Sequence, residues 1–75
     1  MSTPTEAIRE QLMAANEEYR RLRDEHARYA NQLEILLGKS HLSPEEQAEE
    51  VRLKKLKLRV KDQMEALVRQ AQAVH

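Results

Sequence analysis

The chain has 75 residues and a formal net charge of zero, because 13 Lys and Arg residues balance 13 Asp and Glu residues. A chain of this length forms one domain at most, with a core near the lower limit of independent stability, which argues against a deep active site. Charged residues make up 35% and aromatic residues 3% of the chain, and there is no cysteine, so the composition favours long amphipathic helices and excludes disulfides and thiolate chemistry.

A first long helix is predicted from about residue 4 to residue 37. Thr3 is a suitable N-cap, Pro4 fits the first helical position, and Glu6 completes a capping box with Thr3. No glycine or proline interrupts the segment until Gly38. We expect Gly38 to end the helix in the left-handed conformation, which costs glycine least.

A turn over residues 38–43 and a second helix over about residues 44–74 follow. Ser43 is the expected N-cap, Pro44 the first helical residue and Glu46 the return partner of Ser43 in a second capping box. A connection this short normally joins antiparallel neighbours.

Apolar positions recur at alternating steps of four and three in both predicted helices, which is the pattern of helices packed along a seam. The first stripe consists of Ile8, Leu12, Ala15, Tyr19, Leu22, His26, Tyr29, Leu33 and Leu36. The second consists of Leu53, Lys57, Val60, Met64, Leu67, Ala71 and Val74. Reversing the chain pairs Ile8 with Ala71, Leu12 with Leu67, Ala15 with Met64, Tyr19 with Val60, and His26 with Leu53. The predicted fold is an all-α, coiled-coil-like antiparallel two-helix hairpin, with residues 1–75 in a single domain.

The width of the apolar surface bears on self-association. Leu56 and Val68 broaden the second stripe beyond a strict two-stranded seam. Four further apolar residues are expected on the outward faces: Met13, Ile35, Val51 and Leu58. Scattered exposed apolar residues are common, but they also fit a second contact surface, which a marginal hairpin would benefit from. We favour self-association into a helical bundle, with a dimer as the expected oligomer.

No residue pattern predicts catalysis, a cofactor or a metal site. His26, His41 and His75 share no ligand spacing, and no nucleotide-binding, hydrolase or zinc-protease motif occurs. His26 lies on the core-facing stripe, where an imidazole normally forms a hydrogen bond to a neighbour; a pH-sensing or ligand role is the alternative. The sequence therefore predicts a protein that is not an enzyme.

Residues 52–61 form a basic segment without an acidic residue. Its six charged side chains are the candidate partner-binding residues: Arg52, Lys54, Lys55, Lys57, Arg59 and Lys61. The predicted pairing places Arg20, Arg21 and Arg23 beside them. The segment fits a solvated face that pairs with acids of the first helix, a nucleic-acid contact, or the binding of an acidic protein. Lys57 falls on the seam opposite Leu22, where its ammonium is expected to reach Asp24, Glu25 or water.

The second helix resembles a known family. Residues 53–64, LKKLKLRVKDQM, are similar to the LKKxKLxLKDxI signature of the YdcH-like proteins, small bacterial helical hairpins of unknown function. The spacing of Tyr19, Leu22 and His26, and the segment 42–46, also resemble that family. Tyr29 and Met64 depart from its pattern. The resemblance implies a bacterial, cytosolic two-helix hairpin with no assigned activity and no catalytic residues.

The function favoured by the sequence is a non-enzymatic interaction module that docks an unknown protein partner through its basic segment. The alternative is an accessory protein associated with nucleic acid through the same residues. The steep salt dependence of nucleic-acid binding would separate the two. No apolar run reaches the length of a membrane span, and the N-terminus does not resemble a leader, so we expect a cytoplasmic protein without a membrane partner.

Overall fold

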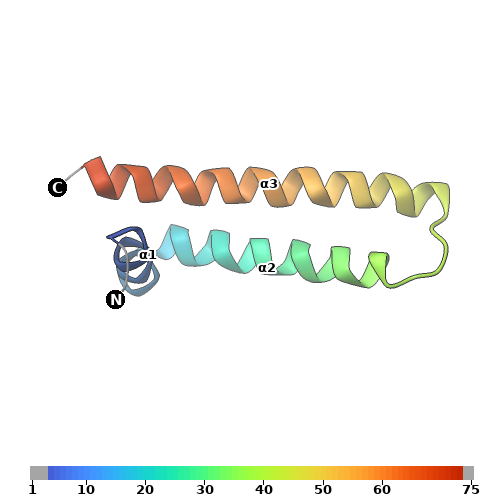
Figure 1. The fold of residues 1–75 in the computed structure, drawn as a ribbon, viewed down its shortest axis with the longest axis horizontal. Coiled ribbons are helices and arrows are strands. Elements are labelled where there is room, and N and C mark those ends of the chain that lie inside the picture. Colours follow the sequence, from blue (N-terminus) through green and yellow to red (C-terminus); the bar gives the residue numbers. More distant parts are fainter. Residues whose placement is uncertain (1–3, 74–75) are drawn as a thin grey trace.

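The computed structural model describes residues 4–73, which form three helices and no strand. Helix α1 spans Pro4–Ala15, α2 spans Glu17–Leu37 and α3 spans Pro44–Ala73. Helices α2 and α3 lie side by side in opposite directions, whereas α1 is seen nearly end-on at the start of α2 (Figure 1). The described residues extend over 49 × 22 × 19 Å. The prediction of an all-helical fold is confirmed, but the described residues form three helices where two were predicted.

The prediction of one uninterrupted helix from residue 4 to residue 37 is wrong at Asn16. This residue has an extended backbone, with φ −110° and ψ 109°, and its side-chain oxygen accepts a hydrogen bond of 2.8 Å from the Tyr19 backbone N–H. Asparagine is among the preferred N-cap residues because its side chain competes with the helical backbone for hydrogen bonds. Glu17 and Glu18 then occupy the first turn of α2, at the positive end of its dipole.

Arg20 connects the two helices across this break. Its Nη1 atom donates hydrogen bonds of 3.0 Å each to the backbone carbonyls of Met13 and Ala14. The last carbonyls of a helix have no partner within the helix, so Arg20 satisfies two of them at the end of α1. The expected Thr3 cap at the start of α1 lies outside the described residues.

The end of α2 also differs from the expectation. Gly38 is right-handed, with φ −76° and ψ −11°, and no residue between 4 and 73 has a positive φ. Its N–H donates to the carbonyl of Glu34 at 3.1 Å, and the Lys39 N–H donates to the carbonyl of Leu36 at 3.1 Å. The chain reverses over the residues that follow, so Gly38 needs no left-handed conformation.

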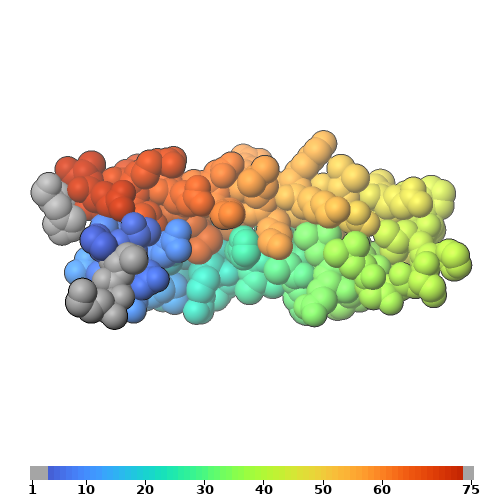
Figure 2. All heavy atoms as spheres, viewed as in Figure 1, coloured from blue at the N-terminus to red at the C-terminus, as the bar shows by residue number. Residues whose placement is uncertain are grey.

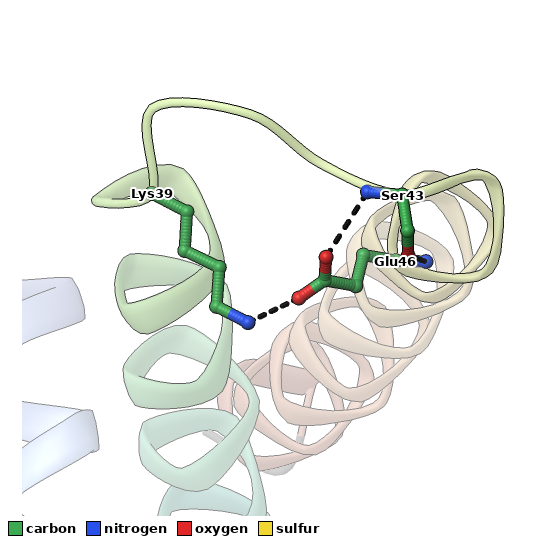
Figure 3. A network of polar contacts seen from close by, with 3 residues as sticks. All are labelled: Lys39, Ser43 and Glu46. Atoms are coloured by element: carbon green, nitrogen blue, oxygen red, sulfur yellow. Dashed lines mark hydrogen bonds and ion pairs between the residues drawn. The ribbon is translucent and has the colours of Figure 1, made fainter.

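The capping box at the start of α3 is confirmed. The Ser43 backbone N–H donates to Glu46 Oε1 at 3.0 Å, and the Glu46 backbone N–H donates to Ser43 Oγ at 3.1 Å. The Lys39 ammonium, from the other side of the connection, forms an ion pair with the second carboxylate oxygen of Glu46 (Figure 3). This Lys39 contact and the Ser43 N–H lower the pKa of Glu46 from 4.5 to about 2.

The core follows the contact between α3 and the other two helices. Its buried members are Ile8, Tyr19, Leu22, Leu33, Leu53, Val60 and Val68. Ile8, Tyr19 and Val68 form one cluster, against which Leu12, Met13, Met64, Leu67 and Ala71 pack. The space-filling view shows α1 lying against the C-terminal part of α3 (Figure 2).

The expected pairing of Tyr19 with Val60 is wrong, since Tyr19 packs in the cluster of Val68. Val60 instead lines a hollow together with Leu22, which the sequence had placed opposite Lys57. The break at Asn16 explains why the pairing of α2 with α3 differs from the prediction. Because α1 does not continue α2 as one straight helix, the contact of Ile8 near Ala71 does not fix which residues of α2 lie opposite those of α3.

The break also changes the face that Met13 presents. Met13 was expected on the outside, but it is half-buried and packs against the Ile8 cluster. The other three residues expected to be exposed are exposed: Ile35, Val51 and Leu58.

Candidate functional site

The six candidate basic residues all lie on α3, but they do not share one face. Lys57 is half-buried, and the other five are exposed. Three of the lysines, Lys54, Lys57 and Lys61, line a groove between α3 and α2. Lys55 and Arg59 line a hollow on another face of α3, beside Asp62.

The groove has a volume of about 620 Å³, and we call it the lysine groove. Helix α2 contributes His26, Ala30, Leu33, Glu34 and Leu37, with Gly38 at its end, and α3 contributes Lys54, Lys57, Leu58 and Lys61. Leu37 and Leu58 are each 59% exposed. Beyond His26 the same side continues toward α1, where a second hollow includes Met64 and Val68. The groove thus places three ammonium groups around an apolar floor.

Two of the basic residues are paired within α3. Arg52 donates hydrogen bonds of 3.1 and 2.7 Å to the two carboxylate oxygens of Glu49, and Lys54 donates one of 3.0 Å to Glu50. The hydrogen bond from Arg52 lowers the pKa of Glu49, and the same contact raises the pKa of Arg52. These are i,i+3 and i,i+4 pairs, which support an exposed helix weakly.

The expected pairing of the basic segment with acids of the first helix does not occur. Between residues 4 and 73, no ion pair joins α2 to α3. Lys57 was expected to reach Asp24, Glu25 or water, and it reaches neither carboxylate. In the described chain no carboxylate lies within 4.0 Å of the Lys57 ammonium or of the Lys61 ammonium. The shifted register accounts for this, because it places Lys57 in the groove with His26.

His26 is half-buried and lines the lysine groove. The hydrogen bond that the sequence led us to expect is absent, since His26 has no bonding partner among the described residues. His41 is exposed in the connection, and His75 lies outside the described residues. Of the two described imidazoles, His26 lines the lysine groove and His41 does not.

The three arginines of α2 were expected beside the basic segment. Arg20 is used at the end of α1, and Arg23 is paired with Asp24 at 3.0 Å. Arg21 shares a hollow with Arg59 of the segment, and it also lies 3.8 Å from Glu18. Each of these three arginines therefore has a contact within α1 or α2.

The described part of the chain contains no group of three or more His, Cys, Asp or Glu side chains that could hold a metal ion. Across residues 4–73, none of the helices has both the length and the apolar character needed to cross a bilayer. The basic segment was visible in the sequence, but the apolar floor of the groove was not. Leu33 belonged to the predicted stripe and Leu58 was an apolar residue outside the seam, but Ala30 and Leu37 carried no signal.

Comparisons of the chain with protein-family models, with curated proteins and with solved structures give no match.

Proposed function

We propose that the protein is a non-enzymatic interaction module that binds an acidic segment of a partner protein in the lysine groove. The observation that carries this proposal is the position of Lys57 and Lys61. Their ammonium groups have no carboxylate within 4.0 Å in the described chain, and they border the exposed Leu37 and Leu58.

The chemistry of the groove favours an amphipathic acidic helix as the bound segment. Such a helix places its apolar stripe in a groove and its charged residues at the rim. Lys57 and Lys61 are four residues apart on α3 and therefore lie on one side of the helix. Carboxylates of the partner would form charge-assisted hydrogen bonds with them, while burial of Leu37 and Leu58 would supply the hydrophobic contribution.

Nucleic acid is the weaker candidate. The chain has no net charge, so no overall field attracts a polyanion. The groove contains no tyrosine on which bases could stack, and Glu34 lies in its lining. Glu65 borders the continuation of the groove next to Lys61, and Tyr19, which also lines this continuation, is only 5% exposed. These features fit a short acidic segment better than a continuous phosphate backbone.

A second copy of this chain does not fit the groove symmetrically. A two-fold axis through Leu58 would place the α3 helices antiparallel and set Lys54 of one copy near Lys61 of the other. Like charges placed opposite each other destabilise such a contact. A dimer about this axis is therefore disfavoured.

The resemblance to the YdcH-like proteins agrees with this proposal but adds no activity to it. Membership of that family, a bacterial source and a cytoplasmic location stay predictions.

The test compares two charge-reversed variants in a cross-linking capture from the native extract. Lys57→Glu with Lys61→Glu alters the groove, and Lys55→Glu with Arg59→Glu makes the same change of charge on another face of α3. We expect the groove variant to lose partners that the wild type and the control retain. Retention by all three proteins, or equal loss from both variants, would contradict the proposal. Partners that disappear after nuclease treatment would favour the nucleic-acid alternative.

A further inference from the structure

We infer that helix α1 is an exchangeable element: the surface that it covers, formed by Tyr19 of α2 and Val68 of α3, can be covered equally by α1 of a second copy. In the exchanged form, Asn16 becomes helical and residues 4–37 make one continuous helix. The inference rests on the break between α1 and α2 and does not depend on the lysine groove.

The hinge is a single residue. Asn16 alone separates Ala15, the last residue of α1, from Glu17, the first residue of α2. Helical hydrogen bonds reach Asn16 from both sides: the Asn16 N–H donates to the Leu12 carbonyl at 2.8 Å, and the Asn16 carbonyl accepts from the Arg20 N–H at 3.2 Å. Straightening the chain thus requires a change of backbone conformation centred on one position.

The surrounding sequence is compatible with both conformations. Neither glycine nor proline occurs between Thr5 and Leu37, and the residues that flank Asn16 are Ala and Glu, which are good helix formers. In a continuous helix, Ile8, Leu12 and Ala15 extend the apolar stripe of α2 at steps of four and three. The bent form is held by two local devices, the Asn16 cap on Tyr19 and the bonds from Arg20 to α1.

Helix α1 is held in place by packing and not by its own stability. It has 12 residues, and isolated helices of that length are marginal in water. Its buried residue, Ile8, joins Tyr19 and Val68 in one cluster, and Leu12 and Met13 pack against it. If α1 swings away from its own chain, this apolar surface is left exposed to water.

A second copy is the occupant that fits this surface, because it carries an identical α1. Exchange between two copies keeps the contacts of the cluster. The free energies of the bent monomer and the exchanged dimer then differ through the hinge and the entropy of association. Short connections that hold a chain in a bent conformation are the usual origin of such exchange. This dimer differs from the one that the sequence favoured, which would join the outward apolar faces.

Substitutions at Asn16 test the inference by sedimentation equilibrium over a wide concentration range. Asn16→Ala removes the cap and favours the continuous helix, whereas Asn16→Gly keeps a tolerated cap and disfavours the helix. We expect Asn16→Ala to raise the ratio of the continuous helix to the bent form by about fivefold per chain relative to wild type. The alanine variant should therefore dimerise at lower concentration. The glycine variant should dimerise less than the alanine variant. Equal association of both variants, or no dimer of either one, would overturn the inference.

A cross-link then shows whether the dimer exchanges α1. The side chains of Thr5 and Gln72 meet, with Gln72 Nε2 donating to Thr5 Oγ1 at 3.4 Å, and the chain has no cysteine of its own. Thr5→Cys and Gln72→Cys are introduced into the Asn16→Ala variant, and the isolated dimer is oxidised. We expect disulfides between chains, seen as covalent dimers on a non-reducing denaturing gel. Disulfides within single chains, or none at all, would contradict the exchange.

Discussion

At the scale of single residues, Glu46 links the first turn of α3 to the residue that follows Gly38. Its carboxylate accepts from the Ser43 N–H and forms an ion pair with Lys39, so that one side chain caps α3 and holds the other side of the connection. Figure 3 shows Lys39 and Ser43 on either side of the Glu46 carboxylate, where the connection joins α3. The capping box was readable from the sequence, but Lys39 was not, because the path of the connecting residues decides which cation reaches the carboxylate.

Replacing Glu46 by glutamine should remove a specific part of the pH dependence of stability. The pKa of Glu46 is about 2 in the folded protein and 4.5 without these contacts. Because folding lowers the pKa, the ionised group stabilises the fold fully above pH 4.5, and this contribution is lost as the pH falls toward 2. We expect Glu46→Gln to be less stable than the wild type near neutral pH and equally stable near pH 2.

Thermal unfolding followed by circular dichroism between pH 2 and pH 6 measures the difference. Glu45→Gln is the matched control, since it removes the same charge from the same first turn of α3. If the unfolding midpoints of wild type and Glu46→Gln differ by the same amount at every pH in this range, the ion pair with Lys39 does not stabilise the fold.

At the scale of elements, the sequence predicts where helices can begin more readily than where they must break. The capping box at Ser43 combines a cap, a proline and a returning glutamate, and these signals reinforce each other. At Asn16 the only signal is an asparagine followed by Glu17 and Glu18, which also fits the interior of a helix. The bend combines local contacts, the Asn16 cap and the bonds from Arg20 to the end of α1, with the packing of Ile8 against Val68, which the sequence does not show.

Gly38 provides a test of an element boundary. Its backbone is right-handed, and a Cβ atom added there would lie 3.5 Å from the carbonyl oxygens of Glu34 and Ile35, which is ordinary contact. Alanine would therefore cause no strain and would reduce the entropy of the unfolded chain. We expect Gly38→Ala to stabilise the protein by about 0.4–1 kcal/mol, measured by urea unfolding. A loss of stability would indicate that Gly38 adopts the left-handed conformation that the sequence first suggested.

At the scale of the whole molecule, the residues that are buried were predicted better than their partners. Leu53 is 1% exposed, as its place on the stripe predicts. The repeat of four and three is nearly the same at every turn, however, so an antiparallel pairing can slide along the helices without losing its apolar character. The observed register differs from the predicted one and places Lys57 in the same groove as His26. For this reason the basic segment was visible in the sequence, while the lysine groove required the structure.

The cluster shared by the three helices makes the stability of the whole molecule depend on the far end of α3. Leu67 is half-buried and packs against Ile8, Tyr19 and Val68. Leu67→Glu would replace an apolar side chain of this cluster with a carboxylate at a half-buried position, at a cost of about 2–3 kcal/mol. A chain of this size has little stability to lose, so we expect a large fall in the midpoint of thermal unfolding.

Both α1 and α2 should lose structure together in this variant, because Ile8 and Tyr19 belong to the same cluster. Gln11→Glu is the control, since it adds the same charge at an exposed position of α1 and should leave the midpoint nearly unchanged. Circular dichroism melting curves of the three proteins distinguish the outcomes. If Leu67→Glu unfolds like the wild type, α3 does not pack against α1 and α2 through this face, and the proposed exchange of α1 loses its basis as well.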